Sequence, residues 1–211
     1  MWVWAISWGI LMSTSVSAQI AATSPGVQQQ FRDHISEIHF SEHSSSPLQG
    51  KWLFYPSQFI VQPSSVLLSK TVELPASFKI LTNSNIGYGT FISHYKIPKE
   101  FIGRRIAIRI PAQYGAYRVY VNGEFIVRLG QISKTPEQQI TEKAPRIGYF
   151  VADSEYITLS IQASNYTHLH GGLERPMQIG VAGTVNRQFQ QLMISIAMAC
   201  GAVLGVGVFN I

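Results

Sequence analysis

Two segments of the chain alternate strictly between apolar and polar side chains. Arg105–Ile110 places its isoleucines on one side, and Tyr156–Gln162 does the same with Ile157, Leu159 and Ile161. A period of two residues is typical of a β-strand with one buried and one exposed face. Both segments are therefore predicted to be half-buried antiparallel strands.

Other short runs rich in β-branched and aromatic residues are bounded by Gly, Pro and Asn, which favours further strands. Asn122-Gly123 separates two of these runs and predicts a tight hairpin, because both residues tolerate positive φ. Many short, evenly spaced strands predict an all-β fold, a jelly-roll β-sandwich. The runs are Trp52–Tyr55, Val66–Leu74, Thr90–Ile97, Tyr117–Val121, Phe125–Leu129 and Met177–Val181.

The first residues form an apolar run, Trp2–Met12, followed by small residues at Val16 and Ala18. This spacing predicts a signal peptide over residues 1–18 with cleavage between Ala18 and Gln19. The segment before the run carries no Lys or Arg, so an uncleaved anchor is the alternative. The run itself is too short to cross about 30 Å of hydrocarbon.

The last segment, Leu192–Ile211, contains no charged residue and has small residues at three- to four-residue intervals. Its length and composition predict a transmembrane helix. A buried core helix is the alternative, but a helix packed on a surface would show a polar face. The expected organisation is a signal peptide (1–18), a polar lead-in (19–47), a β-sandwich (48–187) and a membrane helix (188–211).

Composition changes this picture in two ways. Charged residues make up only 13% of the chain, against about a quarter in typical globular domains, which agrees with a part in lipid. The net charge is +5, with the excess in the middle of the chain. This excess indicates a solvated sheet face, or attraction to acidic glycans or an anionic membrane surface. Nucleic acid is not expected as a partner, because no binding motif is present.

Several short motifs follow one another in a set order along the middle of the chain, and they carry a family resemblance. Together they resemble the extracytoplasmic domain of bacterial seven-transmembrane receptors with diverse intracellular signalling modules. The shared core is similar to the galactose-binding-like jelly roll at the front of β-galactosidase-type enzymes. The resemblance covers about residues 48–185. The motifs are Gly50–Tyr55, Gly89-Thr90 with Ile97-Pro98, Ile106–Pro111, Ala116–Gly123, Gly130, Ser164–Tyr166 and Gly171–Leu173.

The resemblance implies a periplasmic sensor domain at the bacterial inner membrane, with a carbohydrate or another small molecule as ligand and a homodimer as one further arrangement. In that family the membrane bundle begins where Leu192 lies here, and it continues through six more helices into an output module. The sequence ends at Ile211, so we expect either a receptor interrupted in its first helix or a single-pass anchored domain. The alternative function is a membrane-anchored protein-interaction module without a small-molecule ligand.

The stretch Asn165–Pro176 gathers His168, His170 and a Gly-Gly pair. Two imidazoles without a patterned third ligand make a weak metal site, so no metal or cofactor is expected. No nucleophile motif occurs, and we therefore predict no catalytic residue and no enzyme. Gly171 and Gly172, like Asn122 and Gly123, are predicted to shape turns.

Ligand contacts are predicted for exposed aromatic and polar side chains, since an aromatic ring can stack on a sugar and polar groups can fix its hydroxyls. Trp52 and Tyr117 are expected in the core instead. The predicted ligand-binding residues are Tyr88, Tyr114, Tyr120, Asn165, His168, His170 and Arg175.

Overall fold

A computed structural model of the chain describes residues 35–209, with side chains described as far as Val203. The predicted signal peptide and residues 19–34 of the predicted lead-in lie outside the described residues.

The larger of two main sheets has seven strands, in the order β4-β3-β6-β11-β8-β9 with β1 added in parallel to the end of β6. All other neighbours in it are antiparallel. β11 pairs along its whole length with β6 on one side and over Leu159–Ser164 with β8 on the other, so it lies near the centre of the sheet. The strands are β1 (Ile35–Glu37), β3 (Gly50–Pro56), β4 (Lys70–Leu74), β6 (Gly87–Lys96), β8 (Ala116–Val121), β9 (Glu124–Leu129) and β11 (Tyr156–Asn165).

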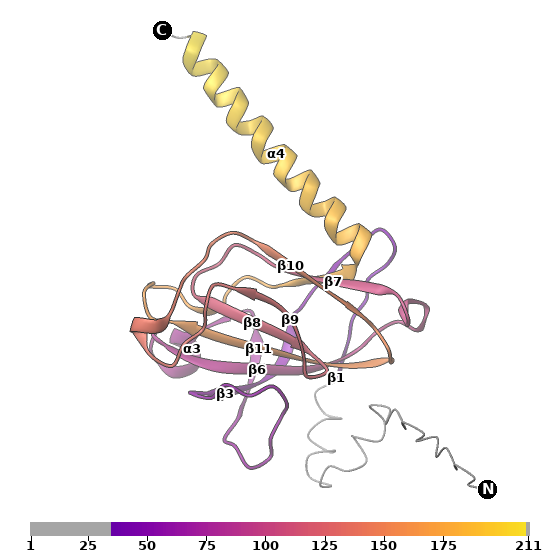
Figure 1. The fold of residues 1–211 in the computed structure, drawn as a ribbon, viewed down its shortest axis with the longest axis vertical. Coiled ribbons are helices and arrows are strands. Elements are labelled where there is room, and N and C mark those ends of the chain that lie inside the picture. Colours follow the sequence, from indigo (N-terminus) through magenta and orange to yellow (C-terminus); the bar gives the residue numbers. More distant parts are fainter. Residues whose placement is uncertain (1–34, 210–211) are drawn as a thin grey trace, which may run out of the picture.

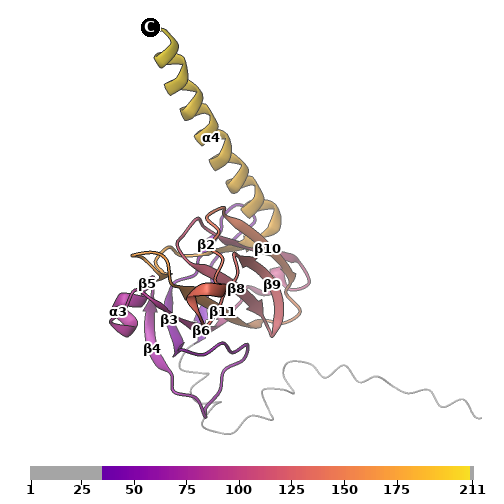
Figure 2. The ribbon, with the colours of Figure 1, turned by 60° about the vertical axis from the view of Figure 1, so that its left-hand side comes forward.

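The smaller main sheet has four strands in the order β10-β7-β13-β2, and a short pair, β12-β5, closes one end. Figures 1 and 2 show the two main sheets as stacked layers, which is the arrangement of a β-sandwich. The all-β prediction is confirmed at this level. The strands are β2 (Ser46–Pro47), β5 (Ala76–Ser77), β7 (Arg105–Ile110), β10 (Arg146–Val151), β12 (Gly172–Leu173) and β13 (Gln178–Val181).

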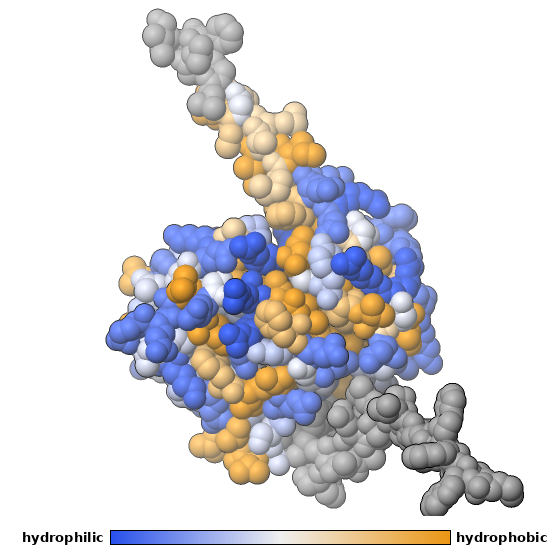
Figure 3. Space-filling model, viewed as in Figure 1, coloured by the Kyte–Doolittle hydropathy of each residue, from blue (hydrophilic) through white to orange (hydrophobic). Residues whose placement is uncertain are grey.

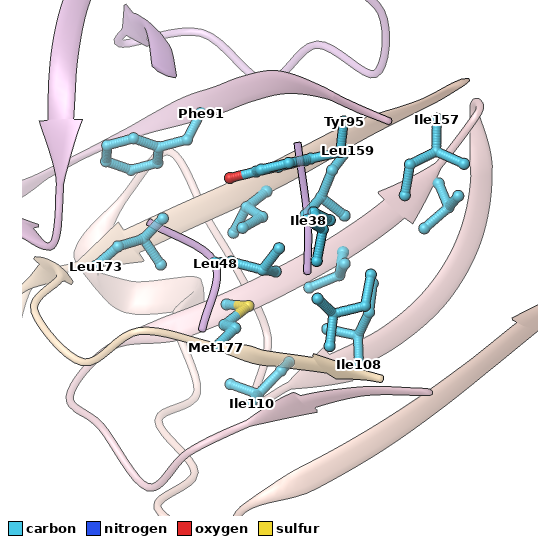
Figure 4. Close-up of a cluster of buried hydrophobic side chains, with 14 of the residues drawn as sticks. Ile38, Leu48, Phe91, Tyr95, Ile108, Ile110, Ile157, Leu159, Leu173 and Met177 are labelled. Carbon is cyan, nitrogen blue, oxygen red and sulfur yellow. The ribbon is translucent and has the colours of Figure 1, made fainter. Parts of the chain in front are cut away.

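The core lies between the two layers and is built from the alternating residues seen in the sequence. The isoleucines of β7 are completely buried, and so are Leu159 and Ile161 of β11, to within 1%. Figure 4 shows Ile108 and Ile110 on one side of this interior and Tyr95 and Leu159 on the other, with Ile38 and Leu48 between them. Trp52 and Tyr117 are also buried, as expected. Burial of apolar surface contributes about 25 cal/mol per Å², so this shared face holds the layers together.

The opposite face of β11 carries a row of polar side chains that are also buried. Ser160 donates to the carbonyl of Val61 at 2.6 Å, and Gln162 donates to that of Ile60 at 3.1 Å. These bonds fasten the segment between β3 and β4 over the outside of the large sheet. Buried polar groups are paired in this way because an unpaired one costs about 1–3 kcal/mol.

Several elements differ from the predictions. The strand predicted over Val66–Leu74 begins only at Lys70, because Val66–Ser69 belongs to the loop that covers the sheet. β10 was not predicted, and it lies on the edge of the small sheet, paired only with β7. A short helix, α3 (Phe78–Thr82), was also missed; Ser77 caps it by accepting a hydrogen bond from the Ile80 amide. Short 3₁₀ turns occur at η1 (Lys99–Phe101) and η2 (Pro136–Gln138).

A single long helix, α4 (Ala182–Phe209), follows β13 directly and projects away from the sandwich (Figure 1). It begins ten residues before the predicted span. No helix in the part of the chain that the structure describes is both long and apolar enough to cross a membrane. The final residues of the predicted span, 204–211, lie outside the described side chains.

The hairpin between β8 and β9 turns at Asn122 and Gly123, whose φ angles are 51° and 89°. The Asn122 side chain also accepts a hydrogen bond from the Thr158 amide of β11 at 2.8 Å. The turn is therefore tied to the central strand as well as closing the hairpin.

We predict that Asn122→Val lowers the free energy of unfolding by about 1–3 kcal/mol, since a β-branched residue resists positive φ. Asn122→Gly keeps positive φ unstrained but loses the side-chain hydrogen bonds to Thr158 and Asp153, and it should cost about 1 kcal/mol. Denaturant unfolding of both variants measures the difference. Equal stability of Asn122→Val and the parent chain would contradict the turn assignment.

Candidate ligand-binding site

A cavity of about 290 Å³ opens at the end of the sandwich near β12. One wall comes from the β7–β8 loop, and the other from the chain between β11 and β13. Its floor is the buried Tyr117, whose hydroxyl donates to the Gly172 carbonyl at 2.7 Å. Burial raises the pKa of Tyr117 far above its ordinary value, so this hydroxyl keeps its proton.

Asn165 shapes the loop that enters the cavity. It ends β11 with no exposed surface, and its amide donates to the carbonyls of Asn85 and His168, both at 2.8 Å. Its oxygen accepts from the His168 amide at 3.3 Å. These three hydrogen bonds all go to backbone groups, so Asn165 positions the loop.

Gly171 and Gly172 are required by close packing. A Cβ on Gly171 would lie 2.5 Å from the Asn165 amide nitrogen. Gly172 has a φ of 102°, and a Cβ there would lie 2.7 Å from the Phe78 nitrogen. Both positions therefore exclude a side chain, and Gly172 also needs a backbone conformation that other residues rarely adopt.

Two predicted ligand residues, Tyr114 and His170, line the cavity, and a third, His168, lies beside Tyr114 outside the lining. The Tyr114 ring lies 5.0 Å from the His168 ring and 5.9 Å from the His170 ring. His170 Nδ1 is 3.5 Å from a carboxylate oxygen of Glu174. Lys143 lies over the Tyr114 ring at 5.5 Å, a cation–π distance.

Arg175 completes the wall, and with it comes Gln113, which the sequence did not point to. The Arg175 guanidinium donates to the Ala112 carbonyl at 2.9 Å, and its backbone amide donates to Gln113 Oε1 at 3.4 Å. Gln113 is only 6% exposed, and its Nε2 has no hydrogen-bond partner among the described residues. No residue-type pattern marks a lone glutamine in a loop as a site residue.

Tyr88 and Tyr120 lie elsewhere. Both project from the outer face of the large sheet. There the ring centroids of Tyr88 and Phe59 are 4.9 Å apart, and those of Tyr120 and Phe125 are 5.9 Å apart. The predicted ligand residues thus divide between the cavity and a separate surface.

The cavity offers both hydrogen-bond donors and acceptors and has one aromatic face. Arg175 and Gln113 supply donors, Glu174 supplies an acceptor, and Tyr114 is 39% exposed at the mouth. In the described residues no cluster of three or more His, Cys, Asp or Glu side chains could hold a metal ion. The arrangement is suited to a small polar ligand.

No family model matches this sequence, and no curated protein matches it. The similar solved structures include parts of three glycosidases. A β-glucuronidase from an uncultured Clostridium species is 13% identical, with a TM-score of 0.49 over 69% of this chain and 30% of that one. A putative β-galactosidase from Bacteroides fragilis is 15% identical, with a TM-score of 0.49 over 64% of this chain and 23% of that one. A β-glucuronidase from Dictyoglomus thermophilum is 18% identical, with a TM-score of 0.46 over 69% of this chain and 29% of that one.

The chain therefore spans less than a third of each of these enzymes. At such low similarity these enzymes carry no inference about ligand or activity, and the fold assignment rests on the two packed sheets.

We predict that Gly172→Val lowers the free energy of unfolding by about 1–3 kcal/mol or more. The variant combines a backbone conformation that valine rarely adopts with a clash against neighbouring backbone atoms. Gly183→Ala is the matched control: a Cβ there meets nothing within 4 Å, and alanine favours the helix. Thermal melting of the two variants tests this, and a Gly172→Val variant as stable as Gly183→Ala would contradict the assigned geometry.

Proposed function

We propose that this protein is a ligand-sensing domain, that the cavity binds a carbohydrate, and that α4 tethers the domain to the bacterial inner membrane with the sandwich in the periplasm. The proposal takes the sandwich to be a galactose-binding-like jelly roll of receptor type, as the sequence motifs suggest. The observation that carries it is the buried, unpaired Nε2 of Gln113 in the cavity wall.

An unpaired buried donor costs about 1–3 kcal/mol, and an oxygen of a bound ligand would recover it. A sugar hydroxyl supplies such an oxygen and can also donate to the Glu174 carboxylate. The neighbouring Arg175 can donate to a second hydroxyl, and the exposed face of Tyr114 can pack against the apolar side of a sugar ring. An apolar ligand would leave these polar groups unpaired.

The path from the cavity to α4 is short, which suits sensing. The chain runs from Arg175 in the cavity wall to β13, and α4 begins at the next residue. The base of the helix is fastened to the sandwich: the Tyr149 hydroxyl donates to Asn186 at 2.8 Å, and Ser45 donates to Gln188 at 2.7 Å. A shift of the cavity wall on binding would therefore be passed to the helix.

The tether is supported by the surface of α4. Figure 3 shows orange and pale orange residues along the visible side of the projecting helix, whereas the visible face of the body mixes hydrophilic and hydrophobic residues. An isolated apolar helix in water is unfavourable, and lipid or another apolar partner would cover it. The exposed apolar side chains are Leu192, Met193, Ile194, Ile196, Met198 and Val203.

A protein-interaction module is the second candidate function, and one observation favours it. Val66 and Leu68, on the loop between β3 and β4, are 90% and 84% exposed. This loop extends from the side of the sandwich opposite to α4 (Figures 1 and 2). Exposed apolar loop tips often contact another protein.

We predict that Gln113→Leu weakens sugar binding about five- to hundredfold, the loss of one buried hydrogen bond. The melting temperature should change little, because the variant removes an unpaired buried donor together with the acceptor of the long Arg175 amide bond. Isothermal titration calorimetry of the full chain in detergent, against a panel of neutral mono- and disaccharides, measures it. Gln139→Leu is the control, since this glutamine also has an unpaired buried atom but lies outside the cavity. Failure of every saccharide to bind the parent chain would favour the interaction module instead.

We also predict that the full chain stays in the membrane pellet after an alkaline wash, whereas a chain ending at residue 187 is released after export. The expected difference arises because only the full chain carries the apolar part of α4. Immunoblots of the two fractions provide the measurement, and release of the full chain would refute the tether.

A further inference from the structure

A second concave surface, separate from the cavity, lies on the outer face of the large sheet. It is an open groove of about 460 Å³. Because α4 packs on β7 and β13 of the small sheet, this groove faces away from the helix. The residues that matter for its chemistry are Phe59, Arg118, Tyr120, Ser133, Lys134 and Gln162.

Both walls of the groove are fixed to the polar face of β11. Gln162 donates to the Ile60 carbonyl and so holds the Phe59 side. On the other side, the Ser133 amide donates to the Ser164 hydroxyl at 3.2 Å, and the Tyr166 hydroxyl donates to the Lys134 carbonyl at 2.6 Å. Hydrogen bonds therefore hold both sides of the groove in place.

The groove has an excess of positive charge. Arg118 on β8 lies directly opposite Arg128 on β9, and like charges in this position destabilise a sheet. Lys134 is the second cation among the residues that line the groove, and Arg128 lies beside Arg118 outside this lining. Within the described residues, no carboxylate forms an ion pair with any of these three side chains.

The two acidic groups nearby, Glu142 and Glu137, are not among the residues that line the groove. Glu142 is engaged by the Gly130 amide and by Arg146, and both interactions hold its pKa below the ordinary value, with a further contribution from Arg128. Glu137 lies in η2 and is exposed to solvent. The Arg118 guanidinium makes only a long contact to the Tyr120 hydroxyl, at 3.5 Å.

We propose that this groove binds an anionic saccharide, with a carboxylate of the sugar on the Arg118 guanidinium and a sugar ring against Tyr120. A guanidinium can hold a carboxylate with two parallel hydrogen bonds. The half-buried rings of Tyr120 and Phe59 offer apolar faces beside it, as sugar recognition requires. An open groove, unlike an enclosed cavity, accepts an internal segment of a longer chain.

The test uses the full chain in detergent, titrated calorimetrically with trigalacturonic acid and with the same trisaccharide after reduction of its carboxylates to alcohols. Inorganic phosphate is a third titrant that carries charge without a ring. We expect the acidic trisaccharide to bind at least tenfold more tightly than either of the others, with an affinity that falls as salt is raised.

Arg118→Gln should lower the affinity for the acidic trisaccharide at least tenfold, and Tyr120→Leu should lower it as well. Arg105→Gln is the matched control, because Arg105 is also a strand arginine beside a tyrosine, 4.4 Å from the Tyr149 ring, but lies on the small sheet. It should bind like the parent. Thermal melting of each variant separates loss of binding from loss of folding.

Three results would overturn the proposal: equal affinity for the acidic and reduced trisaccharides, full binding by folded Arg118→Gln, or equal binding of phosphate. Gln113→Leu distinguishes this groove from the cavity. If that variant lost the acidic trisaccharide while Arg118→Gln kept it, the ligand would belong to the cavity, and only the sugar-binding proposal made for the cavity would stand.

Discussion

The two faces of β11 impose the constraint on which the rest of the structure depends. From Ile157 to Ala163 every second residue of this central strand is apolar and packs into the core, and Ser160, Gln162 and Ser164 on its other face are polar yet also buried. Such a strand can exist only where loops cover its polar face and accept its hydrogen bonds. The loops on the outside of the large sheet are therefore as necessary to the fold as the core itself.

This constraint explains how both concave surfaces are formed. Along the strand, Gln162 and Ser164 fasten two separate loops, and the space between those loops is the groove. At the end of the strand, Asn165 fixes the turn that leads to Gly171 and Gly172 and so sets the cavity wall. One strand thus positions two sites that differ in chemistry, since the cavity presents both donors and acceptors and the groove presents cations.

The position of α4 distinguishes the two sides of the sandwich. The helix packs on the small sheet, while the groove and the apolar loop tip at Val66 and Leu68 lie on the other side. In a tethered domain the groove would face away from the membrane and remain open to large ligands. The chain that forms the cavity wall continues through β13 into α4.

The sequence alone determined the elements whose side chains follow a local period. The alternation in Arg105–Ile110 and Tyr156–Gln162 and the turn residues Asn122-Gly123 predicted strands and a hairpin, because strand pleating and positive φ are local properties of the backbone. It also pointed to Tyr114, His170 and Arg175, which do meet at the cavity. Only the tertiary structure decided that Asn165 serves the loop, that Tyr88 and Tyr120 belong to another surface, and that Gln113 lines the cavity with an unpaired donor. These outcomes depend on which distant segments lie opposite one another, and neither residue type nor spacing along the chain carries that information.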